Sequence, residues 1–237
     1  MADIQTGLVG WWKLDESVGT SAADSSPNNN TGTLTSSPVW SSGRGLSAVG
    51  FTAASNQYIS TAINPSTALS NFTVAAWQNS NGTLTQTILG MWTSATSNKR
   101  FYFRTENTQV RMGMGGGTAV TNDAPVAPGT WYHCVATWDG ATCLIYVNGV
   151  SRGVTVTGTP TTDYSNFGMP IGILFGSSGT PDGSPVPHNG KIYDVRGYNR
   201  VLTPADVSYL YTQGANLKLN NFAPFQSEGL SITGKIR

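Results

Sequence analysis

Short runs of alternating apolar and polar residues recur along most of this chain of 237 residues. Turn-forming Gly, Pro, Asn, Asp and Ser separate the runs, which follow one another about every ten residues. Such spacing is typical of an antiparallel β-sandwich or barrel, in which each strand buries one face. Only 11% of the residues are charged, and no stretch has the Ala, Leu, Glu and Lys content of a helical protein. The pattern therefore predicts an all-β fold.

The runs differ in how clearly they alternate. In the first one Leu8, Trp12 and Leu14 fall on one face of a strand, which predicts that they share one side of a sheet. The runs are residues 8–14, 57–60, 72–77, 87–92, 100–104, 110–114, 131–138, 142–147, 171–175 and 190–198.

Two tight hairpins are predicted near the middle of the chain. An Asp-Gly pair at 139–140 and an Asn-Gly pair at 148–149 each follow an alternating run, and both pairs suit type I′ turns. A two-residue loop at 139–140 places Cys134 opposite Ile145 and leaves Cys143 diagonal to Cys134, about 7 Å away. That separation is too large for an unstrained disulfide, so both cysteines are predicted to be free thiols.

One short helix is predicted after the last strand. Thr203 can cap it, Pro204 suits its first position, Asp206 suits its first turn, and Gly214 is expected at its end. We therefore expect one domain over residues 1–214 and an extended tail over 215–237. The alternating pieces of that tail could add a strand to a neighbour's sheet edge, which predicts a homo-oligomer or larger assembly.

Several motifs, taken in order, resemble laminin-G-like domains of the concanavalin A-like superfamily. They are the opening strand at 7–16, the acidic-Ser-Gly-Asn loop at 24–33, the central hairpin at 131–149, the last strand at 190–200 and the closing helix at 202–214. The resemblance implies a two-sheet antiparallel jelly-roll β-sandwich. It also implies binding of sugars or proteins.

In many members of that superfamily the resemblance further implies one Ca²⁺, near the junction of the acidic loop and the last strand. By resemblance, Asp24 and Asp194 would supply carboxylates, while Asn28 and Asn30 would supply further oxygens. Calcium prefers such hard oxygen ligands and takes six to eight of them.

The chain departs from the family pattern at two positions of this site. Pro27 stands where Gly is common, and Tyr193 stands where a second acidic residue is common. Strand alternation puts Asp194 on the same, inward side as Ile192, so its charge requires a counter-ion. The alternative is that Asp24 caps a turn and that Asp194 pairs with an arginine, Arg196 or Arg200.

A glycan site is the other candidate. Sugar rings stack on aromatic side chains while amides and carboxylates bind their hydroxyls. Most aromatic residues, including Trp12, Trp77 and Trp131, are assigned to the core. The candidates in or beside loops are Trp92, Tyr164, Asn166, Phe175, Asp182 and His188.

Catalysis is not favoured by the acidic residues. Glycoside hydrolysis requires a pair of carboxyl groups, and no glutamate has a second carboxylate two or four residues away. Those glutamates are Glu16, Glu106 and Glu228. A lyase could use His133, Tyr132, Arg104 and Arg111, although the resemblance makes His133 a structural residue of the hairpin.

Charge and terminal sequence limit the partners. A net charge of +1 offers no field for nucleic acid, and no run approaches the roughly 20 apolar residues of a membrane span. The first residues have no basic and apolar signal-peptide pattern, so a virion surface or other extracellular assembly is favoured over free secretion. The sequence thus predicts a non-catalytic module that binds glycans or a surface protein. The alternatives are a phage structural or decoration protein without a sugar ligand, and a polysaccharide lyase or glycoside hydrolase.

Overall fold

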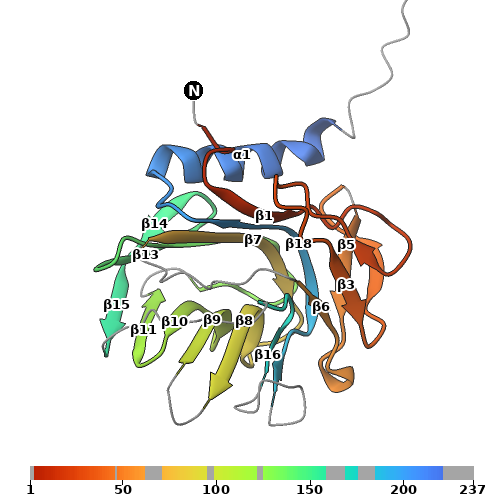
Figure 1. Ribbon diagram of the computed structural model, residues 1–237, viewed down its shortest axis with the longest axis horizontal. Coiled ribbons are helices and arrows are strands. Elements are labelled where there is room, and N and C mark those ends of the chain that lie inside the picture. The colour runs from red at the N-terminus through yellow and green to blue at the C-terminus, as the bar shows by residue number, and fades with distance from the viewer. Residues whose placement is uncertain are drawn as a thin grey trace, which may run out of the picture.

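Two facing antiparallel sheets form most of the molecule (Figure 1). The computed structural model describes residues 3–45, 47–61, 71–94, 99–121, 125–158, 169–175 and 185–220. Sheet A contains β1 (Leu8–Trp12), β4 (Val39–Ser42), β5 (Ser47–Phe51), β7 (Phe72–Ser80), β12 (Tyr132–Trp138), β13 (Cys143–Val147), β14 (Val150–Arg152) and β18 (Gly190–Tyr198). Its order is β14-β13-β12-β7-β18-β5-β4, and β1 also pairs with β18.

Sheet B faces sheet A across the core. It contains β8 (Gln86–Ser94), β9 (Lys99–Glu106), β10 (Gln109–Met114), β11 (Gly117–Thr121) and β15 (Val154–Thr157), in the order β15-β11-β10-β9-β8. Shorter pieces complete the description: β2 (Ser21–Ala22), β3 (Gly32–Thr35), β6 (Tyr58–Ser60), β16 (Ile173–Leu174), β17 (Val186–Pro187) and the 3₁₀ turn η1 (Ala53–Ser55). The predicted all-β, two-sheet jelly-roll sandwich is confirmed.

The main core lies between the inner faces of the two sheets. Phe72 of β7 and Phe101 of β9 meet edge to face across it, with ring centroids 5.7 Å apart. Trp12, predicted as a core residue, is 0% exposed, and so is Trp77, although the Trp77 ring lies on the outer face of sheet A. Burial of each such large apolar side chain stabilises the fold by about 1.5–3 kcal/mol, so this interior holds the two sheets together.

The α-helix of the described part of the chain, α1 (Pro204–Asn220), covers the outer face of sheet A (Figure 1). Its start is capped as predicted: the backbone N–H of Asp206 donates to the Thr203 hydroxyl (3.2 Å), and the N–H of Thr203 donates to the Asp206 carboxylate (3.0 Å). Its apolar side chains Val207 and Leu210 form a second buried cluster with residues of β7 and β12. Because β7 is covered on one face by sheet B and on the other by α1, it is buried along nearly its whole length and its burial does not alternate.

The helix does not end near Gly214, as the sequence predicted, but at Asn220. Residues 217–219, interpreted as part of an alternating tail, are therefore helical. Gly214 serves a different purpose, since a Cβ at this position would lie 2.3 Å from Nε1 of Trp77. The glycine permits a close approach of helix and sheet instead of terminating the helix.

The hairpin at 139–140 also differs from its prediction. Trp138 pairs with Cys143 and Cys134 pairs with Val147, so the loop is longer than two residues. The Asp139 carboxylate explains the longer loop, because it accepts the backbone N–H groups of both Ala141 (2.9 Å) and Thr142 (2.6 Å). The register shifts accordingly, and the predicted pairing of Cys134 with Ile145 is wrong. Both cysteines are free and buried, which confirms the prediction of free thiols.

The opening strand contains an irregularity that the alternation did not reveal. Its register with β18 shifts between Leu8 and Gly10. Leu8 therefore belongs to the cluster under α1, whereas Trp12 and Leu14 belong to the main core. The prediction that these three residues share a face is wrong, because an irregular residue in a strand reverses the alternation beyond it.

Candidate functional site

Asp24 organises a loop beside β1. Its Oδ1 accepts the backbone N–H groups of Trp11 (2.8 Å) and Ser26 (2.8 Å). Its Oδ2 accepts the Ser26 hydroxyl (2.8 Å) and the backbone N–H of Asn30 (2.8 Å). Burial acts to raise the pKa of Asp24, but these hydrogen bonds outweigh it and hold the pKa below its ordinary value. The carboxylate is thus ionised and caps the turn, which is the alternative that the sequence left open.

Asp194 lies at a bulge in β18. The register with β7 shifts between Tyr193 and Arg196, and Asp194 has a left-handed φ of 51°. Ile192 remains in the core at 0% exposure, whereas the Asp194 carboxylate accepts the indole N–H of Trp11 (2.7 Å). The prediction that Asp194 points inward with Ile192 is therefore wrong, because the bulge reverses the alternation.

Arg196 neutralises this carboxylate. Its Nε donates to Oδ1 of Asp194 at 2.8 Å and its Nη2 donates to Oδ2 at 3.2 Å. The guanidinium carbon lies 4.2 Å from the centre of the Trp11 ring, and Arg196 is 7% exposed. Burial opposes the charge of Arg196, but the neighbouring Asp194 carboxylate outweighs it and raises the arginine's pKa. Asp194 thus takes the arginine partner proposed as the alternative to a metal.

The four predicted calcium ligands do lie around one junction with β1. However, the side-chain amides of Asn28 and Asn30 donate to the carbonyl oxygen of Val9 (2.9 and 3.4 Å). The oxygens of Asp24 already accept backbone N–H groups and a hydroxyl, and those of Asp194 accept the indole N–H of Trp11 and the guanidinium of Arg196. Among the described residues no three His, Cys, Asp or Glu side chains gather as a metal-binding group. As arranged here, the donors do not fit the oxygen shell that calcium requires, and calcium binding stays a prediction from the resemblance.

A shallow hollow of about 380 Å³ opens beside the hairpin of β4 and β5. Trp40 is half-buried there, and its Nε1 donates to the carbonyl oxygen of Gly19 (2.8 Å), which fixes the orientation of the indole. The volume falls within the range of small-molecule sites. The residues that line the hollow are Ser17, Trp40, Ser41, Ser42 and Ser47.

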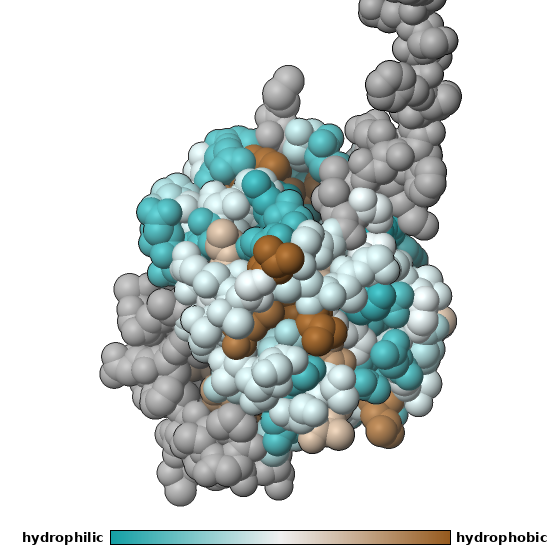
Figure 2. Space-filling view, turned by 90° about the vertical axis from the view of Figure 1, so that its right-hand side faces the viewer, coloured by the Kyte–Doolittle hydropathy of each residue, from teal (hydrophilic) through white to brown (hydrophobic). Residues whose placement is uncertain are grey.

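The surroundings of the hollow combine apolar, polar and charged groups. Val18 and Val39, the chain neighbours of Ser17 and Trp40, are 76% and 60% exposed. The Nζ of Lys191 donates to the backbone oxygen of Ser42 (2.9 Å) and so brings a positive charge to its edge. On the side of the molecule that carries β3, β5 and β6, apolar residues form small separate areas among polar ones (Figure 2). An open site with one aromatic ring and several serines suits the C–H faces and hydroxyls of a sugar.

Of the six residues predicted to bind glycan, the two whose side chains the structure describes, Phe175 and His188, do not line this hollow. Phe175 is half-buried and meets Tyr58 edge to face at 5.1 Å. His188 is 0% exposed, so its ring offers no surface to a ligand. Of the others, Tyr164, Asn166 and Asp182 lie outside the described residues, and so does the side chain of Trp92.

His133 lies in a row of aromatic side chains on the outer face of sheet A. Tyr193, Trp77 and His133 occupy paired positions on β18, β7 and β12. The Trp77 ring centroid is 5.8 Å from that of Tyr193 and 5.2 Å from that of His133, and Tyr211 of α1 covers it. Burial lowers the pKa of His133 to about 4. The histidine is therefore neutral and enclosed, as expected of a structural residue.

The remaining members of the proposed lyase set lie elsewhere. Arg104 and Arg111 are paired across β9 and β10 of sheet B, and Glu106 forms an ion pair with each of them. The hydroxyl of Tyr132 accepts the backbone N–H of Ala127 (3.2 Å). These side chains do not converge with His133 on one surface.

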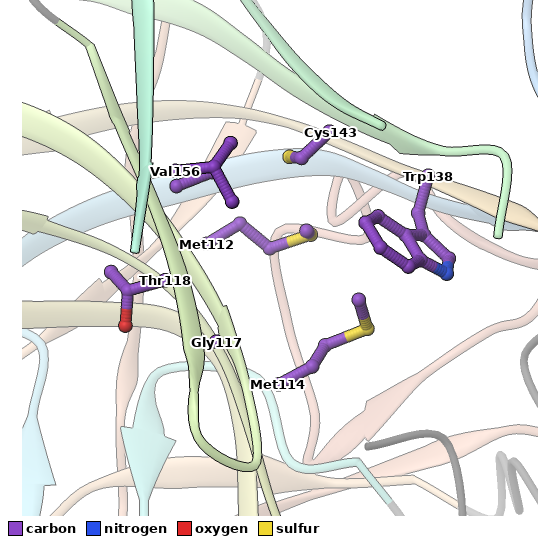
Figure 3. Close-up of a pocket in the computed structure, with 8 residues that line it drawn as sticks. Met112, Met114, Gly117, Thr118, Trp138, Cys143 and Val156 are labelled. Atoms are coloured by element: carbon purple, nitrogen blue, oxygen red, sulfur yellow. The ribbon is translucent and has the colours of Figure 1, made fainter. Parts of the chain in front are cut away.

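A second void lies inside the sandwich, between β10, β11 and the central hairpin (Figure 3). The thioethers of Met112 and Met114 turn toward the indole of Trp138 there. Its volume of about 10 Å³ is that of a single water at most, so it is no ligand site.

Sequence reasoning missed Trp40. The residue stands between Pro38 and a run of serines, which resembles a turn more than a strand. The signal that could have identified it is a single aromatic residue within a serine-rich stretch, the composition expected of a shallow sugar site.

Comparison with known proteins gave one family. Residues 53–208 match a laminin G model described as the concanavalin A-like lectin/glucanases superfamily. No curated protein matches the chain.

Solved structures share the fold at low sequence identity. Domain 4 of AbnA, a GH43 extracellular arabinanase from Geobacillus stearothermophilus in complex with arabinotriose, is 18% identical with a TM-score of 0.65, over 87% of this chain and 99% of that one. A botulinum neurotoxin type C structure, whose cell entry depends on two ganglioside molecules, is 11% identical with a TM-score of 0.61, over 87% of this chain and 51% of the toxin chain. A Trypanosoma rangeli sialidase mutant with trans-sialidase activity is 15% identical with a TM-score of 0.59, over 89% of this chain and 33% of the sialidase chain.

Proposed function

This chain belongs to the concanavalin A-like lectin/glucanases superfamily, and from that membership we propose that it is a non-catalytic module that binds glycan at the Trp40 hollow. The observation that carries the proposal is the half-buried indole of Trp40, held by Gly19 and surrounded by serines in an open hollow. A sugar ring would stack on the indole, and its hydroxyls would bond to the serine groups.

Two further observations support binding over catalysis. The solved arabinanase domain of the same fold holds arabinotriose, and the botulinum structure concerns a protein that interacts with gangliosides. In this chain the carboxylate of Glu106 is held by Arg104, and that of Glu16 accepts the backbone N–H of Ala23 (2.6 Å). Hydrolysis would instead require two carboxyl groups free to act on one bond.

An oligosaccharide array that includes arabinotriose tests the proposal. We expect the wild-type protein to retain at least one sugar, and Trp40→Ala to weaken that binding by about tenfold or more, since one aromatic stack and its buried area are lost. Isothermal titration with the best sugar of the array measures the change.

Trp131→Phe is the matched control, because Trp131 is also a half-buried tryptophan that packs against the main core. Its affinity for the same sugar should equal that of the wild type, and circular dichroism should show that every variant is folded. Equal binding by wild type and a folded Trp40→Ala would remove the hollow from the proposal. Retention of no sugar at all would favour a structural role, such as that of a decoration protein on a virion.

A further inference from the structure

Trp11 connects both carboxylates of the junction beside β1. Its backbone N–H donates to Asp24 (2.8 Å), and its indole N–H donates to Asp194 (2.7 Å). Two cations lie over its ring, with Arg196 4.2 Å and the Nζ of Lys13 5.0 Å from the centroid. The region where the resemblance implied a metal thus already contains positive charge.

The contact between Arg196 and Asp194 is well suited to replace a bound cation. Two N–H···O bonds of 2.8 and 3.2 Å join the groups, and the side chains of Arg196 and Asp194 are only 8% and 12% exposed. A planar guanidinium can bind a carboxylate in two places while it stacks on an indole, which a metal ion cannot do. A divalent cation at Asp194 would have to displace this guanidinium and would leave like charges close together.

The bulge in β18 is what makes this arrangement possible. The left-handed backbone at Asp194 and the register shift before Arg196 allow both side chains to contact Trp11 from the same strand. Regular alternation would also put residues 194 and 196 on one face, but on the inward side with Ile192. The bulge therefore brings the acid and its counter-ion together next to β1.

We infer that Arg196 is the internal cation of this junction and that the Asp24 loop, β1 and β18 are held together without calcium. The guanidinium compensates the negative charge of Asp194, and Trp11 links that ion pair to Asp24 through its two hydrogen bonds. The inference is independent of the sugar site, because none of these residues lines the Trp40 hollow.

Thermal unfolding tests the inference directly. The protein is stripped with EDTA, dialysed, and heated either with EDTA or with millimolar CaCl₂. We expect the two wild-type melting temperatures to coincide. Arg196→Gln should lower the melting temperature by about 5–10 °C or more, because it leaves a half-buried carboxylate without its counter-ion. The double variant Asp194→Asn/Arg196→Gln should regain part of that loss, because the uncompensated charge is gone.

Lys13→Gln is the matched control, since Lys13 lies over the same ring but forms no ion pair with the described carboxylates. Its melting temperature should stay near that of the wild type. A higher wild-type melting temperature in CaCl₂ than in EDTA would overturn the inference, and so would a loss in Arg196→Gln no greater than that in Lys13→Gln. If Arg196→Gln does not fold, Arg196→Lys replaces it, with an expected smaller loss, and the wild-type comparison remains decisive.

Discussion

His133 and His188 are the only histidines of the chain, and the fold removes both from water. Burial lowers the pKa of each to about 4, whereas an unfolded histidine titrates near pH 6.5. Between these values the unfolded chain binds more protons than the folded one. The contribution of the two neutral histidines to the free energy of unfolding is therefore fully present above about pH 6.5 and is lost as the pH falls toward 4.

We expect the free energy of unfolding to fall by about 1.4 kcal/mol per pH unit for each histidine across this range. Urea denaturation at pH 7 and pH 5 measures the change. His133→Gln and His188→Gln should each reduce the dependence on pH by about half, because carboxylates titrate mainly at lower pH. A stability that is the same at pH 7 and pH 5 would show that these rings are not buried as described.

For single residues, the sequence predicted the location of the two junction carboxylates more accurately than the contacts that they form. The resemblance located Asp24 and Asp194 at one junction, and their turn-capping and arginine-pairing roles were the stated alternatives. The side of the sheet on which Asp194 lies could not be predicted, because a bulge leaves no trace in simple alternation. Trp40 was missed because its serine-rich neighbours resemble a turn.

The contact between α1 and sheet A depends on Gly214. A methyl group there would meet the Trp77 indole at 2.3 Å, and Trp77 is enclosed by Tyr193, His133 and Tyr211. Alanine improves helix propensity by about 1 kcal/mol, but overpacking against a ring that cannot move costs about 1–3 kcal/mol.

We therefore expect Gly214→Ala to destabilise the protein, although the same change in an exposed helix stabilises it. Chemical denaturation compares it with Gln213→Ala, an exposed neighbour in α1 whose substitution should be nearly neutral. A more stable Gly214→Ala protein would mean that the helix does not approach the sheet this closely.

Elements with clear alternation or caps were predicted well. The strand at Gly190–Tyr198 and the start of α1 agree with their predictions. Five strands of the two main sheets, β4, β5, β11, β14 and β15, were not identified, because each has only three to five residues and too short a run to distinguish from a loop. The predicted end of α1 was wrong because Gly214 is needed for close packing of the helix against Trp77 and does not terminate the helix.

For the whole molecule, the predicted interaction arm is now confined to residues 221–237, which lie outside the described residues, because α1 includes residues up to Asn220. If this segment joins copies of the chain, deletion of 221–237 should reduce the oligomer size while the melting temperature is retained. Size-exclusion chromatography with light scattering measures the mass. An unchanged mass would remove the arm from the proposed assembly, and a lower melting temperature would mean that the segment stabilises its own domain.

The two-sheet architecture could be predicted because repeated alternating runs and several motifs in order restrict the chain to one class of fold. The order of strands in sheet A could not, because short motifs carry no information about distant partners. The clearest example is β18, which pairs with three strands that lie far from it in the sequence, β7, β5 and β1.

The central place of β18 has a consequence for how the chain reaches its native state. Residues 190–198 are synthesised after all the other strands that the structure describes, yet they join neighbours from the first third of the sequence. Until they arrive, β5 and β7 lack a shared partner and their open hydrogen-bonding edges are available to other chains. We expect slow folding, limited by this last long-range closure, and a dependence on chaperones during synthesis.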